Sequence, residues 1–262
     1  MTMALSKVVP LPAAFTARPL AHRGLHDRAA GRIENAMAAF RAAITHGYGI
    51  ELDVQMSADG QAMVFHDDRL DRLTDARGLL RARTAAELAR IALRDSDDTI
   101  PMLPEVLALV AGKVPVLIEI KEGLDSMGPT DGRLEAAVAR AIAAYSGPVA
   151  VMSFNPNCVA HMARLSPDVA RGLTTDSYDP AEYAPLPSEK CTHLRAIADY
   201  DSIGCSFISH LASDLMRPRV QELKAQGAAI LCWTIRSPTE EAAARQVADG
   251  ITFEGYMARH PA

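Results

Sequence analysis

The chain of 262 residues has an ordinary composition for a soluble globular protein, with 49% hydrophobic and 23% charged residues. Its length suits one α/β barrel, and we expect a single domain over residues 1–262. The net charge of −5 excludes an extended basic surface for nucleic acid or for an anionic membrane. A protein of this charge that binds phosphate must supply positive charge locally.

The sequence indicates a cytoplasmic protein without stable membrane association. The apolar run over residues 8–15 is short and contains two prolines, which is a poor pattern for a signal peptide. No segment approaches the ~20 uninterrupted apolar residues of a membrane span, and none has the pattern of an amphipathic surface helix. No CxxC pair or zinc-type spacing is present, so we expect four buried free thiols in a reducing compartment, at Cys158, Cys191, Cys205 and Cys232.

Strands and helices alternate along the chain. Asn35 is the predicted N-cap of a helix over residues 36–46, and Asp59-Gly60 predicts a tight hairpin turn. Strands are predicted at residues 19–22, 50–54, 62–65, 116–121, 149–154, 171–174, 205–209, 229–234 and 251–253. Further helices are predicted at residues 84–92, 104–112, 134–145, 158–165, 189–200, 215–226 and 238–248.

This alternation predicts a parallel sheet with right-handed crossovers. Nine strand candidates compete for the eight places of a barrel, and a two-residue turn at Asp59-Gly60 cannot make a parallel connection. We therefore predict a (β/α)8 TIM barrel with one irregular hairpin after the second strand. An open doubly wound sheet is the alternative, although no GxGxxG or GxxxxGK motif follows a strand.

Three carboxylates are candidates for a metal site. Glu51 and Asp53 alternate with apolar residues and so share one face of the 50–54 strand. Burying two ionised carboxylates together costs several kcal/mol per ion on the order given for buried charge unless a cation joins them. Glu119 occupies an equivalent face of the 116–121 strand, and ligands of oxygen alone suit Mg²⁺ or Ca²⁺. The alternative is a structural ion network of these acids with Arg23 and Lys121.

Two strand-end histidines, His22 and His66, lie beside these acids in the predicted barrel. One imidazole can deprotonate an attacking hydroxyl while the other protonates a leaving alkoxide. Arg23 and Lys121 would form a cationic clamp for a phosphate. Two histidines, a hard cation and two fixed bases fit phosphodiester cleavage better than any other reaction class.

These residues belong to an ordered set of motifs that resembles one family. The chain is similar to the glycerophosphodiester phosphodiesterases from about residue 18 to the C-terminus. This resemblance implies a phospholipase-C-like barrel that hydrolyses glycerophosphodiesters to glycerol 3-phosphate and an alcohol. The motifs are His22-Arg23-Gly24, Glu34-Asn35, Glu51-Leu52-Asp53-Val54, Asp59-Gly60, His66-Asp67, Pro101 to Val106, Glu119-Ile120-Lys121, Ser153-Phe154 and Cys232-Trp233-Thr234.

The resemblance also implies roles for individual residues. It makes His22 and His66 the acid/base pair, and it places Arg23 and Lys121 near the phosphate. Its implied metal ligands are Glu51, Asp53 and Glu119. It implies that Glu34 is a polar site residue and that Trp233 lines the substrate pocket, with core packing as the alternative for the indole. Ser153 lacks a G-x-S-x-G elbow and is expected to be structural.

The chain departs from the family pattern near its end. Phe253-Glu254-Gly255-Tyr256 stands where the family has a Thr-Asp-x-Pro-like segment, which affects details of the substrate pocket. The short 123–132 segment predicts an open pocket for small, water-soluble head groups such as those of glycerophosphocholine and glycerophosphoethanolamine. The rival interpretations are a lysophospholipase-D-like enzyme and a non-catalytic barrel that binds a phosphate ligand. The sequence leaves two alternatives for the group that attacks the phosphorus, the glycerol 2-hydroxyl and water.

Overall fold

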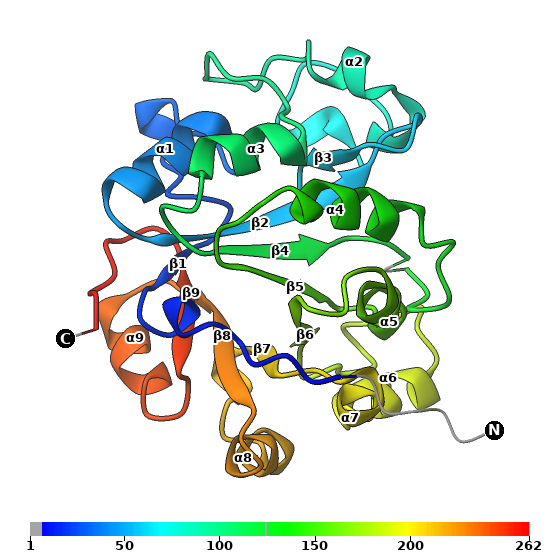
Figure 1. The fold of residues 1–262 in the computed structure, drawn as a ribbon, viewed down its shortest axis with the longest axis vertical. Helices are drawn as coiled ribbons and strands as arrows, with labels where there is room; N and C mark the ends of the chain where they lie inside the picture. The colour runs from blue at the N-terminus through cyan, green and yellow to red at the C-terminus, as the bar shows by residue number, and fades with distance from the viewer. Residues whose placement is uncertain (1–6, 124, 262) are drawn as a thin grey trace.

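The computed structural model describes residues 7–123 and 125–261, so both ends of the predicted 1–262 domain and residue 124 of the 123–132 segment lie outside it. Eight parallel strands close into a barrel, because the first strand pairs with both the second and the last (Figure 1). This closure confirms the (β/α)8 barrel and excludes the open sheet. The strands are β1 Leu20–Ala21, β2 Gly49–Met56, β3 Ala62–Val64, β4 Val116–Ile120, β5 Val149–Ser153, β6 Ala170–Thr175, β7 Phe207–Leu211, β8 Ala229–Ile235 and β9 Gly250–Phe253.

The strand outside the barrel is β3, which forms the predicted irregular hairpin with β2. It pairs with β2 in antiparallel fashion, with Met56 opposite Ala62, and takes no place in the barrel. The segment from β3 to residue 102 then makes an excursion at the top of Figure 1 before the next barrel strand. Its apolar side chains, among them Phe65, Leu70 and Leu88, form a separate small core. This core gives the irregular segment a fixed position beside the barrel.

An outer layer of helices covers the barrel strands (Figure 1). The helices are α1 Met37–Thr45, α2 Ala85–Leu88, α3 Leu103–Val110, α4 Arg133–Ala143, α5 Pro156–Leu165, α6 Ser188–Arg195, α7 Tyr200–Ile203, α8 Pro218–Ala225 and α9 Pro238–Ala244. The single helix expected over residues 189–200 is wrong. The helix is interrupted at Ile197, whose backbone is left-handed with φ 49° and whose side chain is buried. Packing of that side chain therefore outweighs continuation of the helix. Within the described part of the chain, no helix has the length and apolar character needed to span a bilayer.

The base of the barrel interior is filled with apolar side chains. Leu117, Phe207 and Leu231 come from different strands and pack together there with Phe15, which the N-terminal segment contributes. Gly172 provides room for the Phe207 ring, since a Cβ at this glycine would lie 2.5 Å from the ring. Because side chains alternate along a strand, the residues two positions further along face the same interior at the C-terminal face. Because the base is filled with apolar side chains, polar side chains of the interior are left to the C-terminal face of the barrel.

We predict that Leu117→Ala lowers the free energy of unfolding by about 2–5 kcal/mol, because Leu117 is fully buried beneath the site. Urea denaturation measures the change. Leu165→Ala, at a position with 45% exposure, is the matched control and should change stability by less than about 0.5 kcal/mol. Equal losses in the two variants would contradict the packed interior.

Candidate active site

Three buried carboxylates converge at the C-terminal ends of β2 and β4. Asp53 and Glu119 are direct neighbours in the strand register, and Glu51 lies two residues before Asp53 on the same face. One oxygen from each of the three side chains lies within 4.8 Å of the other two. The structure thus brings together the acids that the sequence singled out. Three like charges in a buried place require positive charge nearby.

Two cations partly balance this cluster. Lys121 Nζ lies 3.1 Å from Asp53 Oδ1 and 2.5 Å from Glu119 Oε1, and Arg23 Nε lies 3.2 Å from Asp53 Oδ2. Burial alone would raise the pKa of Asp53, but Lys121 and the surrounding cations outweigh it and lower that pKa. Burial, together with the charges of Asp53 and Glu119, holds the pKa of Glu51 well above its usual range. The cluster is therefore short of positive charge beside Glu51.

Asn35 belongs to this site and is not a helix N-cap as expected. Helix α1 begins at Met37 with Ala36 as its N-cap. The backbone of Asn35 is left-handed, with φ 58°, a region that asparagine tolerates better than most residues. Its Nδ2 donates to Asp53 Oδ2 at 2.9 Å, and its Oδ1 accepts from the Asp53 amide at 3.3 Å. The asparagine thereby fixes the orientation of the central carboxylate.

His22 follows β1 and stands between two carboxylates. Its Nδ1 lies 2.5 Å from Glu254 Oε2, and its Nε2 lies 4.0 Å from Glu51 Oε2. Burial lowers the pKa of His22, although the hydrogen bond with Glu254 opposes this shift. The Nε2 side of the ring thus faces the acid cluster, and the Nδ1 side faces away from it.

His66 comes from the excursion after β3 and is held by an adjacent ion network. Its Nδ1 lies 2.7 Å from Asp67 Oδ1. Arg72 donates to both oxygens of Asp67, and it also makes two hydrogen bonds of 2.7 Å with Glu34. Glu34 in turn accepts from Arg23 Nη1 at 2.6 Å. The network therefore connects His66 with the acid cluster through Arg23.

The acid cluster has the chemistry of a hard-cation site. Lys121 donates to one oxygen of Glu119, and the Arg23 amide donates to one oxygen of Glu51 at 3.0 Å. Among the hydrogen bonds of residues 7–123 and 125–261, these engage only one oxygen of each of the two side chains. Two carboxylate oxygens beside a charge deficit, with no nitrogen or sulfur among the clustered atoms, fit Mg²⁺ or Ca²⁺. The residues present thus suit a divalent metal ion.

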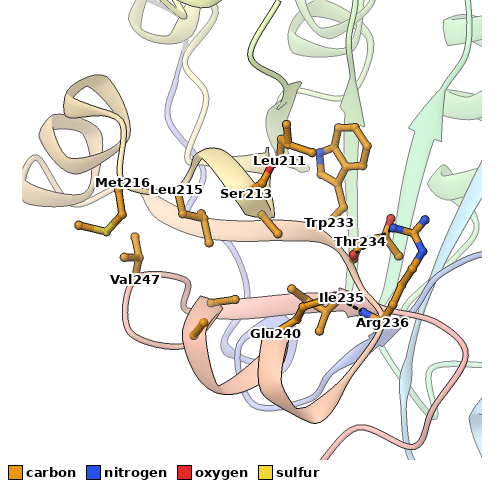
Figure 2. A pocket seen from close by; sticks show the side chains of 13 residues that line it. Leu211, Ser213, Leu215, Met216, Trp233, Thr234, Ile235, Arg236, Glu240 and Val247 are labelled. Carbon is orange, nitrogen blue, oxygen red and sulfur yellow. Dashed lines mark hydrogen bonds between the residues drawn. The ribbon is translucent and has the colours of Figure 1, made fainter.

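Trp233 borders a groove of about 550 Å³ at the same end of the barrel. Figure 2 shows Trp233 and Arg236 toward one end of the lining and Met216 and Val247 toward the other. The indole Nε1 donates to Ser209 O at 3.1 Å, and its ring contacts Phe154 edge-on with a centroid separation of 5.5 Å. Lys121 Nζ lies 5.9 Å from the centroid of the same Phe154 ring. Phe154 thus contacts Trp233 on one side and Lys121 on another.

Several residues of this site had no assigned role in the sequence. Arg72 lies in an irregular charged stretch without periodicity, and Glu254 lies in the segment that departs from the family pattern. For Asn35, the only sequence feature that pointed to the site was its position beside Glu34. An asparagine at that position is equally well predicted to be a helix N-cap. Ser153, by contrast, is fully buried and donates to Ile120 O, which fits the structural role expected.

A barrel with an acidic metal-type cluster and two carboxylate-supported histidines at its C-terminal face defines a class, that of the phosphodiesterase barrels. A model of the glycerophosphoryl diester phosphodiesterase family matches residues 22–253. The chain belongs to this family, and it hydrolyses glycerophosphodiesters. The resemblance seen in the sequence motifs is thereby confirmed.

Individual relatives agree with this membership. A putative glycerophosphodiester phosphodiesterase of Bacillus subtilis, YhdW, is 27% identical over 251 residues, which cover 92% of this chain and 94% of the relative. A glycerophosphodiester phosphodiesterase of Caldanaerobacter subterraneus is 33% identical over 164 residues, 59% of this chain and 65% of that protein. The structure of an Oleispira antarctica phosphodiesterase with the product sn-glycerol-3-phosphate superposes with a TM-score of 0.72 and 25% identity, covering 90% and 92% of the two chains.

The Asp67 contacts predict an acid-sensitive contribution to stability. Burial alone would raise the pKa of Asp67, but His66 and Arg72 outweigh it and lower that pKa. The contribution is then complete above the unfolded-state pKa of about 3.9 and is lost as the pH falls toward the folded-state value. In EDTA, the free energy of unfolding of the wild type should fall more steeply below about pH 4 than that of Asp67→Asn. Asp201→Asn, at an exposed position, should keep the wild-type slope; identical slopes in all three proteins would contradict the ion network.

Proposed function

We propose that the chain hydrolyses small, water-soluble glycerophosphodiesters, of the glycerophosphocholine and glycerophosphoethanolamine type, to glycerol 3-phosphate and an alcohol. The observation that carries the proposal is the acid cluster of Glu51, Asp53 and Glu119 beside His22. These three acids would hold Mg²⁺ or Ca²⁺. The bound cation would act as a Lewis acid on the phosphoryl oxygens and neutralise charge that develops on them.

Residues of the chain itself would move the protons and orient the phosphate. His22 and His66 would be the acid/base pair, since each Nδ1 already faces a carboxylate and each Nε2 is left for proton transfer. Burial alone would lower the pKa of Lys121, but Asp53 and Glu119 outweigh it and raise that pKa, so its ammonium group stays charged beside the phosphate. Arg23 would contribute a second cation from the opposite flank of Asp53.

Two routes of attack use the same residues. The glycerol 2-hydroxyl would give a cyclic phosphate that is opened in a second step, whereas direct attack by water would give glycerol 3-phosphate at once. In ¹⁸O-water, a cyclic phosphate trapped early in the reaction supports the first route. Its absence at every time point, with ¹⁸O in the first product formed, supports the second.

A lysophospholipid substrate is a second candidate, and the groove beside Trp233 favours it. Most of the groove lining is apolar, and Met216 at its outer end is 75% exposed. An acyl chain could bury its methylenes against this apolar surface. Each buried methylene would contribute about 0.8 kcal/mol of favourable binding free energy. Comparison of lysophosphatidylcholine with glycerophosphocholine tests this candidate: a kcat/KM at least tenfold higher for the lysophospholipid would replace the first proposal with the second.

Removal of the metal is predicted to abolish turnover. Wild-type protein treated with EDTA should release no choline or ethanolamine from the glycerophosphodiesters, and added Mg²⁺ or Ca²⁺ should restore release, because uncompensated charge would remain at the acid cluster. Choline oxidation coupled to a peroxidase measures glycerophosphocholine hydrolysis. Absence of hydrolysis of glycerophosphocholine, glycerophosphoethanolamine and lysophosphatidylcholine with every divalent ion tested would contradict the proposed function.

Each histidine is predicted to be needed for turnover. His22→Ala and His66→Ala should each lower kcat by roughly 10²–10⁴-fold, the usual loss on removing a general acid or base. The matched control is His193→Ala, which removes another carboxylate-paired histidine, 2.7 Å from Asp199 on the outer helices, and should keep wild-type kcat. Wild-type turnover in either site variant would show that the acid/base assignment is wrong.

A further inference from the structure

The barrel seam places His22 beside Glu254. Strands β1 and β9 are parallel neighbours with Ala21 opposite Phe253, so the next residue of each strand, His22 and Glu254, stands at the same level. The His22 amide donates to Phe253 O at 2.9 Å, and the Glu254 amide donates to Ile235 O at 3.0 Å. Backbone hydrogen bonds on both sides of β9 therefore fix the separation of the two side chains.

Glu254 divides its two oxygens between different partners. Oε2 lies 2.5 Å from His22 Nδ1 and 3.5 Å from His26 Nε2. Oε1 accepts from Arg236 Nε at 2.8 Å. The Glu254 side chain is 20% exposed, whereas that of Arg236 is 61% exposed. The arginine holds the carboxylate from the solvent side, so the carboxylate points inward at the imidazole.

This arrangement selects one form of the imidazole. A carboxylate only accepts hydrogen bonds, so the proton of neutral His22 belongs on Nδ1. The lone pair is then on Nε2, which lies 4.0 Å from Glu51 Oε2 and faces the acid cluster. If the proton were on Nε2, the lone pairs of Nδ1 and of the carboxylate would face each other at 2.5 Å.

We propose that Glu254 is a positioning residue for catalysis, which orients the ring of His22 and keeps its proton on Nδ1 so that Nε2 is the proton-transferring atom. Arg236 supports this role by fixing the second oxygen of the carboxylate. The role rests on the proposed function of His22 as one member of the acid/base pair. Asp67 makes the corresponding contact with His66 Nδ1, supported by Arg72, so both histidines have a carboxylate and an arginine behind them.

Glu254→Gln tests the proposal by removing the charge and keeping the size of the side chain. We expect kcat for glycerophosphocholine to fall roughly 10–100-fold, the range typical of groups that orient catalytic ligands, while KM stays within about twofold. The matched control is Glu222→Gln, because Glu222 also pairs with an arginine, Arg219 at 3.4 Å, and lies outside the site. Glu222→Gln should keep kcat within about twofold. A wild-type kcat in Glu254→Gln would overturn the proposal.

A second measurement does not depend on activity. In EDTA-treated protein labelled with ¹⁵N-histidine, long-range ¹H–¹⁵N correlation spectra distinguish the two neutral tautomers, and His22→Gln identifies the resonance of His22 among the eight histidines. Wild type should show the proton on Nδ1, and Glu254→Gln should shift the population to Nε2. If kcat falls while the tautomer stays unchanged, the residue is merely structural and the proposal fails.

Two further variants keep the proposal testable if Glu254→Gln does not fold. Glu254→Asp retains the charge and shortens the side chain by one methylene, so kcat should lie between those of the wild type and Glu254→Gln. Arg236→Gln leaves the carboxylate in place and should lower kcat less than Glu254→Asp; the reverse order would assign the role to Arg236. If the wild type shows no EDTA-sensitive hydrolysis, the proposed function fails, and the tautomer measurement alone decides whether Glu254 positions His22.

Discussion

The electrostatic balance around Asp53 is the constraint on which the rest of the site depends. Its carboxylate is buried between Lys121, Arg23 and Asn35, and every one of these partners makes a second contact within the site. Lys121 also contacts Glu119, and Arg23 contacts both Glu34 and, through its amide, Glu51. A buried charge with fewer partners would cost several kcal/mol on the order given for such groups. The positions of the cationic residues therefore follow from keeping this one acid ionised.

Different parts of the fold hold the two histidines in position. His22 depends on the regular hydrogen bonding of the barrel seam, whereas His66 depends on the excursion after β3, where Arg72 contacts both Asp67 and Glu34. Irregular structure at this level is stable because the excursion has its own apolar core. The excursion meets the connection between β1 and α1 at the Arg72–Glu34 pair, and Glu34 in turn contacts Arg23 beside the acid cluster.

Local patterns predicted the parts of this site that lie on regular strands. Alternation along residues 50–54 and 116–121 was enough to place Glu51, Asp53 and Glu119 on one interior face, and Asp59-Gly60 was enough to predict the hairpin. The contact of His22 with Glu254 spans 232 residues and depends on which strand closes the barrel, so no local pattern indicates it. Asn35 shows a different limit, because a capping asparagine and a left-handed asparagine directed at Asp53 have the same sequence context.

The seam between β1 and β9 joins the first and the last barrel strands to be synthesised. A ribosome delivers His22 early and Glu254 some 232 residues later, and β1 has no neighbour on its second side until β9 emerges. Growing chains and fragments that stop before residue 250 therefore have an open barrel with an unsupported imidazole. The last strand to be made is thus the one that brings Glu254 to His22.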